Sequence, residues 1–84
     1  MYYTYVLLCK DKGGKKIYIG FTGDLKSRIE QHRRKMVKTT KSFDEVELIY
    51  YESCRNKTDA RKREIQLKTG FGRGYLKRRL ENDI

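Results

Sequence analysis

One segment near the N-terminus constrains the fold more than any other. From Tyr2 to Cys9, aromatic, aliphatic and β-branched side chains occupy both alternating sets of positions. This pattern favours a strand covered on both faces, and therefore a central strand of a sheet. Its longest apolar run, Tyr5 to Cys9, is far shorter than the roughly 20 residues that cross a membrane. We expect no membrane segment and no cleaved leader, and hence a cytoplasmic protein.

A hairpin signal follows this strand. Gly13-Gly14 lies between two apolar runs, so Lys16 to Gly20 should return antiparallel beside the first strand. With a two- or four-residue connection, odd positions of the first strand share a face with even positions of the second, which puts Tyr5 and Tyr18 on one side. A three-residue loop would reverse that arrangement.

A helix is predicted from about Asp24 to Met36. Thr22 to Asp24 supplies residues that start helices, and an apolar or weakly polar side chain then recurs every three or four positions. The recurring residues are Leu25, Ile29, His32 and Met36. At 100° per residue, Arg28 falls beside this stripe. The polar and basic segment after it, from Val37 to Ser42, is expected to be a loop.

Later segments predict a third strand and two more helices. Val46 to Glu52 alternates like a strand. Thr58 or Asp59 begins a second helix that runs to about Lys68 and stops at Gly70, and it carries Glu64 on its apolar face. The glycine-rich stretch from Gly70 to Gly74 predicts a loop before a last short helix.

This order, strand-strand-helix-strand-helix-short helix, predicts the fold class. We expect an α/β (α+β) sandwich in which helices cover a small three-stranded, mostly antiparallel sheet. Eighty-four residues suit a single domain, spanning residues 1–84. The expected core comprises Val6, Leu8, Ile17, Ile19, Leu25, Ile29, Leu48, Tyr50, Leu67, Leu76 and Leu80.

Charge points to nucleic acid as the partner. The chain has 21 Lys and Arg against 11 Asp and Glu, a net charge of +10. Ten of these Lys and Arg residues, but only two of the Asp and Glu residues, lie between Arg55 and Arg79. Binding through phosphate contacts should therefore depend steeply on salt and read little sequence. The candidate nucleic-acid-binding residues are Lys16, Arg33, Arg61, Lys68, Arg73, Arg78 and Arg79.

The cysteines point to no metal centre. Cys9 and Cys54, with a single histidine, cannot furnish a four-ligand zinc site. We interpret both as free thiols. A catalytic pairing of Cys9 with His32 is set aside because nothing near Cys9 argues for a lowered thiol pKa.

Five polar side chains are awkward if only folding matters. Each has an ordinary structural explanation alone: strand packing for two tyrosines, and hydrogen bonds or ion pairs for the others. Together they supply what phosphodiester hydrolysis requires, namely a base, a cation for the developing charge and a carboxylate for a divalent metal. The five candidate catalytic residues are Tyr5, Tyr18, Arg28, His32 and Glu64.

The spacing of these residues also resembles a known family. Tyr3-Thr4-Tyr5, Tyr18-Ile19-Gly20, Arg28, His32 and Glu64 follow one another as in the GIY-YIG nuclease domain. The resemblance covers essentially the whole chain. It is closest to small stand-alone members related to the nuclease module of bacterial nucleotide-excision repair and to homing endonucleases, which implies a setting in DNA repair. Two departures are that Tyr3-Thr4 replaces the Gly-Ile of the first motif, and that no Asn follows Glu64 between Lys68 and Gly74.

The resemblance implies a role for each candidate. Glu64 would hold a single Mg²⁺ or Mn²⁺, which agrees with the preference of Mg²⁺ for one or two carboxylates plus water and phosphate. Arg28 would bind the charged phosphate through its two-pronged guanidinium. Tyr5 or His32 would be the general base, and both assignments stay open. Tyr18 would complete the hydrogen-bonded site.

We therefore expect a metal-dependent endonuclease that hydrolyses DNA phosphodiester bonds with little sequence specificity, selecting by structure or single-strandedness. RNA remains an alternative substrate. The rival function is a non-catalytic nucleic-acid-binding module with the same fold. A third is a structural partner of a larger repair or ribonucleoprotein assembly, with the basic face docked on RNA. The expected oligomeric state is a monomer or weak homodimer.

Overall fold

A computed structural model describes all residues, 1–84. The elements follow the predicted order. They are β1 (Tyr2–Asp11), β2 (Gly14–Thr22), α1 (Leu25–Arg33), β3 (Glu45–Cys54), α2 (Lys57–Leu67) and α3 (Gly70–Arg79). The chain therefore folds into a three-stranded antiparallel sheet with three helices, the α+β class expected from the sequence.

The sheet has the order β2-β1-β3, so β1 is the central strand, as its two apolar faces predicted. Lys12 and Gly13 form a two-residue connection, because Asp11 pairs directly with Gly14. Gly14 has φ of +130°, a conformation that L side chains rarely adopt. In this register Leu7 lies opposite Tyr18. Tyr5 and Tyr18 therefore share a face of the sheet.

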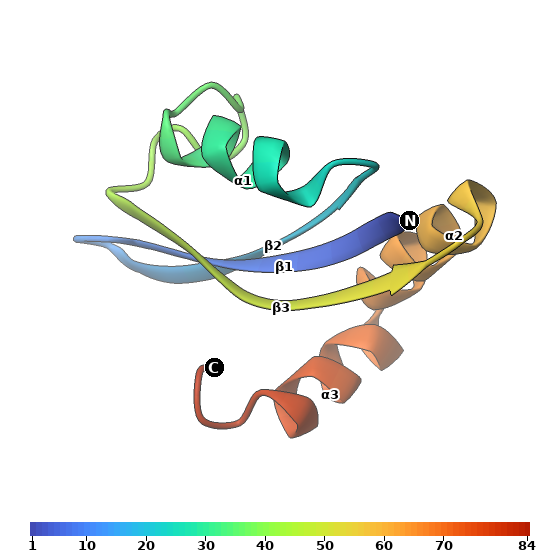
Figure 1. The fold of residues 1–84 in the computed structure, drawn as a ribbon. Coiled ribbons are helices and arrows are strands. Elements are labelled where there is room, and N and C mark those ends of the chain that lie inside the picture. The colour runs from blue at the N-terminus through green and yellow to red at the C-terminus, as the bar shows by residue number, and fades with distance from the viewer.

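The helices cover the sheet on both sides. Figure 1 shows α1 above one face, with α2 and α3 on the other. Each face has its own core. Tyr5, Leu7, Cys9 and Ile29 form the cluster beneath α1, and Val6, Ile19, Leu67 and Leu76 form the cluster against α2 and α3. The central strand thus contributes to both clusters through alternate side chains.

The expected core is only partly correct. Ile17 is 36% exposed because it lies near the hairpin on the outer strand β2. Tyr5, Leu7 and Cys9, which the expected core lacks, are fully buried. The omission arose because the odd-numbered face of β1 is as well covered as the even-numbered one.

Helix α1 is shorter than predicted. It begins after Asp24, whose carboxylate accepts a hydrogen bond from the Ser27 backbone N–H, and it ends at Arg33. Lys35 adopts φ of +60°, which turns the chain out of the helix. Met36 consequently leaves the predicted buried stripe and is 67% exposed. The loop that follows sends Thr40 back into the interior.

The prediction of a loop over residues 70–74 is wrong. Helix α3 already begins at Gly70, and Thr69 caps it by accepting a hydrogen bond from the Gly72 N–H. A Cβ on Gly72 would collide with the backbone of Gln66 and Leu67. The glycine therefore serves the close packing of α3 on the end of α2, rather than flexibility.

No helix in the structure is long and apolar enough to cross a membrane.

Candidate active site

A buried hydrogen-bond chain joins β1, α1 and the loop after α1. The Tyr5 hydroxyl lies 2.8 Å from His32 Nε2, and His32 Nδ1 lies 2.8 Å from the Thr40 hydroxyl. All three residues are buried, with at most 1% of their surface exposed. Buried polar groups are stabilised when each finds a partner, as here. These hydrogen bonds fix both the position of the His32 imidazole and the direction of the Tyr5 hydroxyl.

Arg28 extends this chain toward the surface. One turn before His32 on α1, its Nε donates to the Tyr5 hydroxyl oxygen at 3.4 Å, and its Nη1 donates to Gln31 at 2.9 Å. Because the Tyr5 oxygen accepts from Arg28, its proton is free to point at His32 Nε2. Nδ1 of His32 then carries the ring proton and donates it to Thr40. With this assignment of the His32 tautomer, the three hydrogen bonds run in one direction from Arg28 to Thr40.

Burial shifts the pKa values of Tyr5 and His32, two titratable members of this hydrogen-bond chain. Burial raises the pKa of Tyr5 to about 12, although the Arg28 guanidinium opposes the rise. Burial, assisted by the positive charge of Arg28, lowers the pKa of His32 to about 4. At neutral pH the tyrosine therefore keeps its proton and the histidine is uncharged. His32 Nε2 is then an acceptor.

The second tyrosine stands at the edge of the cluster. The Tyr18 ring centroid lies 5.1 Å from that of His32 and 6.3 Å from that of Tyr5. Tyr18 and Arg28 are half-buried, unlike the fully buried Tyr5 and His32. The structure thus brings four of the five candidates together, and Tyr18 and Arg28 form their accessible side.

Gly20 explains the last position of the Tyr18-Ile19-Gly20 sequence. It pairs with Tyr5 across the two strands. A Cβ at this position would overlap the Tyr5 ring and its hydroxyl. Only glycine lets the tyrosine lie across the neighbouring backbone and reach His32.

The fifth candidate, Glu64, lies apart from these four. It is on α2, which packs against the opposite face of the sheet, and only 5% of its surface is exposed. Arg61 holds one carboxylate oxygen and Lys68 the other, the latter at 3.0 Å. None of its hydrogen bonds or ion pairs reaches the cluster around Tyr5.

Glu64 offers a divalent metal one carboxylate, and two cations already pair with it. Its carboxylate is a hard oxygen donor of the kind that Mg²⁺ and Mn²⁺ accept, but no group of three His, Cys, Asp or Glu side chains gathers anywhere in the molecule. Arg61 and Lys68 are about half exposed, so either can move aside. These donors suit an ion that reaches the protein with water and substrate phosphate, and not a preformed metal cage.

A cationic cavity connects the two regions. It has a volume of about 640 Å³ and lies between the outer strand β2 and helix α3. Tyr18 lines it on one side, and Lys68, the partner of Glu64, lines it on another. Of the seven predicted nucleic-acid-binding residues, Lys16, Lys68 and Arg73 line this cavity.

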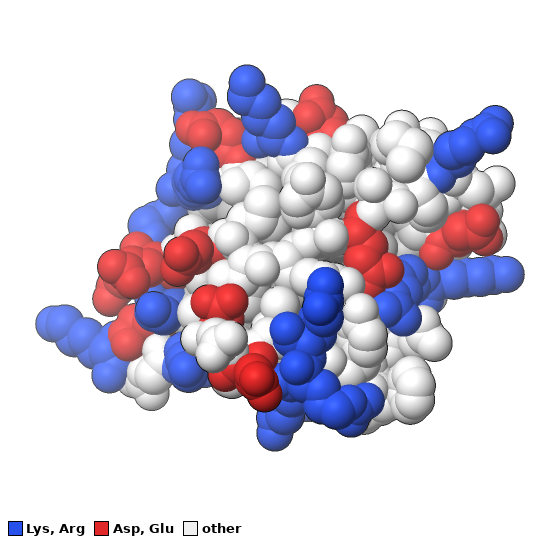
Figure 2. Space-filling model, turned by 60° about the horizontal axis from the view of Figure 1, so that its bottom comes forward, with Lys and Arg blue, Asp and Glu red and all other residues white.

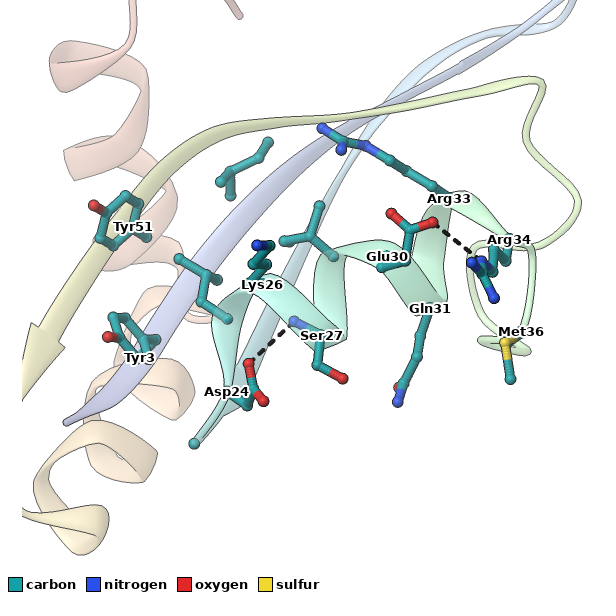
Figure 3. Close-up of a pocket in the computed structure, with 14 residues that line it drawn as sticks. Tyr3, Asp24, Lys26, Ser27, Glu30, Gln31, Arg33, Arg34, Met36 and Tyr51 are labelled. Atoms are coloured by element: carbon teal, nitrogen blue, oxygen red, sulfur yellow. Dashed lines mark hydrogen bonds and ion pairs between the residues drawn. The ribbon is translucent and has the colours of Figure 1, made fainter.

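The other four predicted contacts are dispersed. Arg33 lines a different cavity of about 1090 Å³ between α1 and β3, where Figure 3 shows Tyr3 and Tyr51 near each other at one end. Arg61 pairs with Glu64, and Arg78 and Arg79 are exposed on the last turn of α3. Figure 2 likewise shows basic groups separated by acidic and uncharged surface. On the face that Figure 2 draws, the basic side chains therefore do not form one continuous patch.

Sequence reasoning missed Thr40. Its hydroxyl holds His32, yet it lies in a loop where no helical or strand period singles it out. Thr69, in the segment where the family pattern has an Asn, uses its hydroxyl to link α2 and α3 by donating to the Gln66 carbonyl and accepting from the Gly72 N–H. Cys9 and Cys54 are free thiols, as interpreted.

Comparison with known proteins decides the family. The sequence profile described as GIY-YIG catalytic domain matches residues 1–79. The chain belongs to the GIY-YIG catalytic domain family. It is 38% identical to a UPF0213 protein of Clostridium perfringens over 69 residues, which cover 81% of this chain and 71% of that protein. A UPF0213 protein of Staphylococcus haemolyticus is 36% identical over 69 residues, which cover 81% of this chain and 80% of that protein.

A third relative gives the same result. A UPF0213 protein of Pediococcus pentosaceus is 41% identical over 68 residues, which cover 80% of this chain and 68% of that protein. No solved structure matches the chain. Membership of the family supports a nuclease function with nucleic acid as substrate, and GIY-YIG nucleases generally depend on a divalent metal.

Proposed function

We propose that this GIY-YIG protein is a metal-dependent endonuclease that hydrolyses DNA phosphodiester bonds with little intrinsic sequence specificity. The observation that carries the proposal is the buried hydrogen-bond chain from Arg28 through Tyr5 and His32 to Thr40. A neutral histidine beside a tyrosine hydroxyl has a free lone pair for a proton, and its lowered pKa makes it a weaker base than an ordinary imidazole. An arginine beside it is a ready binding group for phosphate.

The two pKa shifts favour a relay over either residue acting alone. With a pKa of about 12, Tyr5 does not supply a tyrosinate at neutral pH. His32 is uncharged but fully buried, so it cannot meet the attacking water itself. In the relay, water gives a proton to Tyr5 as Tyr5 gives its own to His32 Nε2. The water oxygen bonds to phosphorus, and the bond between phosphorus and the leaving oxygen breaks. The leaving oxygen takes the bonding electrons and a proton from solvent water, and His32 afterwards returns its proton to solvent through Tyr5.

Arg28 controls access to this relay. It lies over the Tyr5 hydroxyl, which has no exposed surface in the free protein. When its guanidinium turns to the substrate phosphate, the hydroxyl becomes reachable by water. Two N–H groups can then bind two phosphate oxygens and stabilise the extra negative charge of the transition state. Tyr18, at the accessible edge, adds a hydroxyl to the same site.

Glu64 is the residue that would hold the Mg²⁺ or Mn²⁺. Its carboxylate is free for this role only when Arg61 or Lys68 moves away. When bound, the metal would supply positive charge to the phosphate oxygens. Arg61 and Lys68 carry that positive charge in the free protein, so the region is ready for an anion in either state.

One observation favours a second function. Both oxygens of Glu64 are already paired, and no contact joins Glu64 to the tyrosines. This arrangement suits a nucleic-acid-binding module in which the glutamate has a structural role. The cationic cavity serves that function equally well, because phosphate binding requires no turnover.

Cleavage assays distinguish the two functions. Labelled single-stranded, duplex and branched DNA and a matched RNA are incubated with the protein in Mn²⁺, Mg²⁺ or EDTA. We expect cutting of DNA in either metal, loss of cutting in Glu64→Gln, and retention in Glu52→Gln. Glu52 is a matched control because it too forms an arginine ion pair, with Arg63, but has no assigned metal.

Each other outcome rejects part of the proposal. Unchanged cutting in Glu64→Gln removes the metal role of Glu64. Salt-dependent binding without cutting of any substrate by the wild-type protein identifies a binding module. Cutting of RNA alone replaces DNA as the substrate class.

A further inference from the structure

The cavity between β2 and α3 combines two kinds of surface. Five cations line it, Lys15, Lys16, Lys68, Arg73 and Lys77, and no aspartate or glutamate side chain does. Apolar side chains line it as well, with Ile17, Ile19 and Leu76 among them. A volume of about 640 Å³ lies within the range of small-molecule sites, roughly 300–1000 Å³.

Exposure of Ile17 is the second observation. This isoleucine was expected in the core, yet it is 36% exposed, while Ile19 on the same strand and Leu8, its partner on β1, are buried. Phosphate contacts alone require only the cationic side chains. An accessible aliphatic surface among these cations instead suits a ligand with a flat apolar face and negative charges attached to it.

We propose that this cavity binds an unpaired nucleotide of the substrate, with its base against Ile17 and its flanking phosphates on the lysine and arginine side chains that line it. This inference rests on the proposed function and names its substrate class as single-stranded or locally unpaired nucleic acid. A base within a duplex is covered by its stacked and paired neighbours, so it cannot offer a face to the cavity. An unpaired base can.

The location connects the cavity with the chemistry. Tyr18 belongs both to the cavity wall and to the cluster with Tyr5 and His32. A nucleotide held in the cavity therefore lies next to the four-residue cluster. Lys68, on another wall, brings the same nucleotide near Glu64.

Binding measured in EDTA tests the cavity without any cleavage. Fluorescence anisotropy is recorded with a labelled thymidine 12-mer, an abasic 12-mer with the same phosphates, and a 12-base-pair duplex. We expect the wild type to bind the thymidine 12-mer more tightly than the abasic one. Ile17→Ser should weaken binding of the thymidine 12-mer about five- to tenfold through lost apolar contact, and leave the abasic 12-mer and the duplex unaffected.

Ile65→Ser is the matched control. Ile65 is also an exposed isoleucine, at 53%, but it lies on α2 and does not line the cavity. It should bind all three probes like the wild type. Circular dichroism establishes that each variant is folded, and the wild-type comparison of the thymidine and abasic 12-mers needs no variant at all.

Two results would overturn the inference: equal wild-type affinity for the thymidine and abasic 12-mers, or equal losses in Ile17→Ser and Ile65→Ser. Failure of the nuclease proposal looks different. If the protein distinguishes the two 12-mers through Ile17 but cuts nothing, the cavity proposal is supported and the nuclease proposal is rejected. If it cuts DNA but binds both 12-mers equally, the nuclease proposal is supported and the cavity proposal is rejected.

Discussion

At the scale of single residues, the environment of His32 determines its protonation state and therefore its part in the proposed proton transfer. It is the only histidine in the chain, and burial together with Arg28 sets its protonation. Sequence reasoning found this residue from its helical spacing but left open whether it or Tyr5 is the base. The choice depends on hydrogen-bond direction and burial, which spacing does not report. The contact with Thr40 depends on a loop conformation, so it could not be predicted from residue spacing either.

The pKa of His32 is directly measurable. Because the chain has a single histidine, its ring signals in an NMR titration need no assignment by mutation. We expect a midpoint near pH 4, well below the ordinary 6.5. A midpoint near 6.5 would show that the ring is solvated and would remove the neutral acceptor from the proposed relay.

The same shift predicts how stability depends on pH. Between pH 6.5 and pH 4 the unfolded state binds a proton that the folded state does not, so stability falls as the pH falls through this window. From pH 7.5 to 4.5 the histidine should cost about 2–3 kcal/mol of unfolding free energy. Urea unfolding of the wild type and of His32→Gln isolates this term, which the variant should lack. Equal pH dependence in both proteins would contradict it.

Arg28→Lys tests the two-pronged contact. The variant keeps the positive charge, so DNA binding should change little. Cleavage should fall by about 10²-fold or more, because a lysine offers no fork to two phosphate oxygens. Arg34→Lys, at an exposed ion pair on the same helix, serves as the control and should cleave normally. Full cleavage by Arg28→Lys would show that only the positive charge at position 28 is needed, and not the two-pronged contact.

At the level of elements, the sheet could be predicted and the glycine-rich segment could not. The central position of β1 follows from its two apolar faces. The sequence left the register open between different lengths of the connection, and the structure has the two residues Lys12 and Gly13 there. Residues 70–74 predicted a loop because glycine disfavours helices. Contact with the end of α2 outweighs that preference at Gly72, and such tertiary contacts leave no trace in local sequence patterns.

Two alanine substitutions in α3 test this explanation. Gly72→Ala should lower stability by about 1–3 kcal/mol, because its Cβ would strike the backbone of Gln66 and Leu67. Gly70→Ala meets nothing within 4 Å and should be neutral or stabilising by up to about 1 kcal/mol. Thermal unfolding compares the two variants with the wild type. Equal melting temperatures for both would mean that α3 does not pack closely on α2.

For the whole molecule, net charge predicts an affinity for polyanions but not where they bind. The excess of ten positive charges was evident from the sequence. The structure gathers Lys16, Lys68 and Arg73 at one cavity and leaves Arg78 and Arg79 farther along α3. Long-range contacts between β2, α2 and α3 create this grouping, and these lie outside any local pattern.

The salt dependence of binding tests the extent of the footprint. Charge reversal of Arg78 and Arg79 should weaken DNA binding and flatten the plot of log affinity against log salt. Each lost duplex phosphate contact lowers the slope by about 0.9. Metal dependence of cleavage should not change. An unchanged slope would exclude these two arginines from the interface.

The central claim is that the Tyr5 hydroxyl takes part in hydrolysis. The most direct test is the single-turnover cleavage rate of Tyr5→Phe in Mn²⁺, measured on the substrate that the wild type cuts best. The variant removes one oxygen atom and leaves the ring that packs across Gly20. The account predicts a rate at least about 10²-fold lower, with DNA binding unchanged. Cleavage by Tyr5→Phe at the wild-type rate would contradict it.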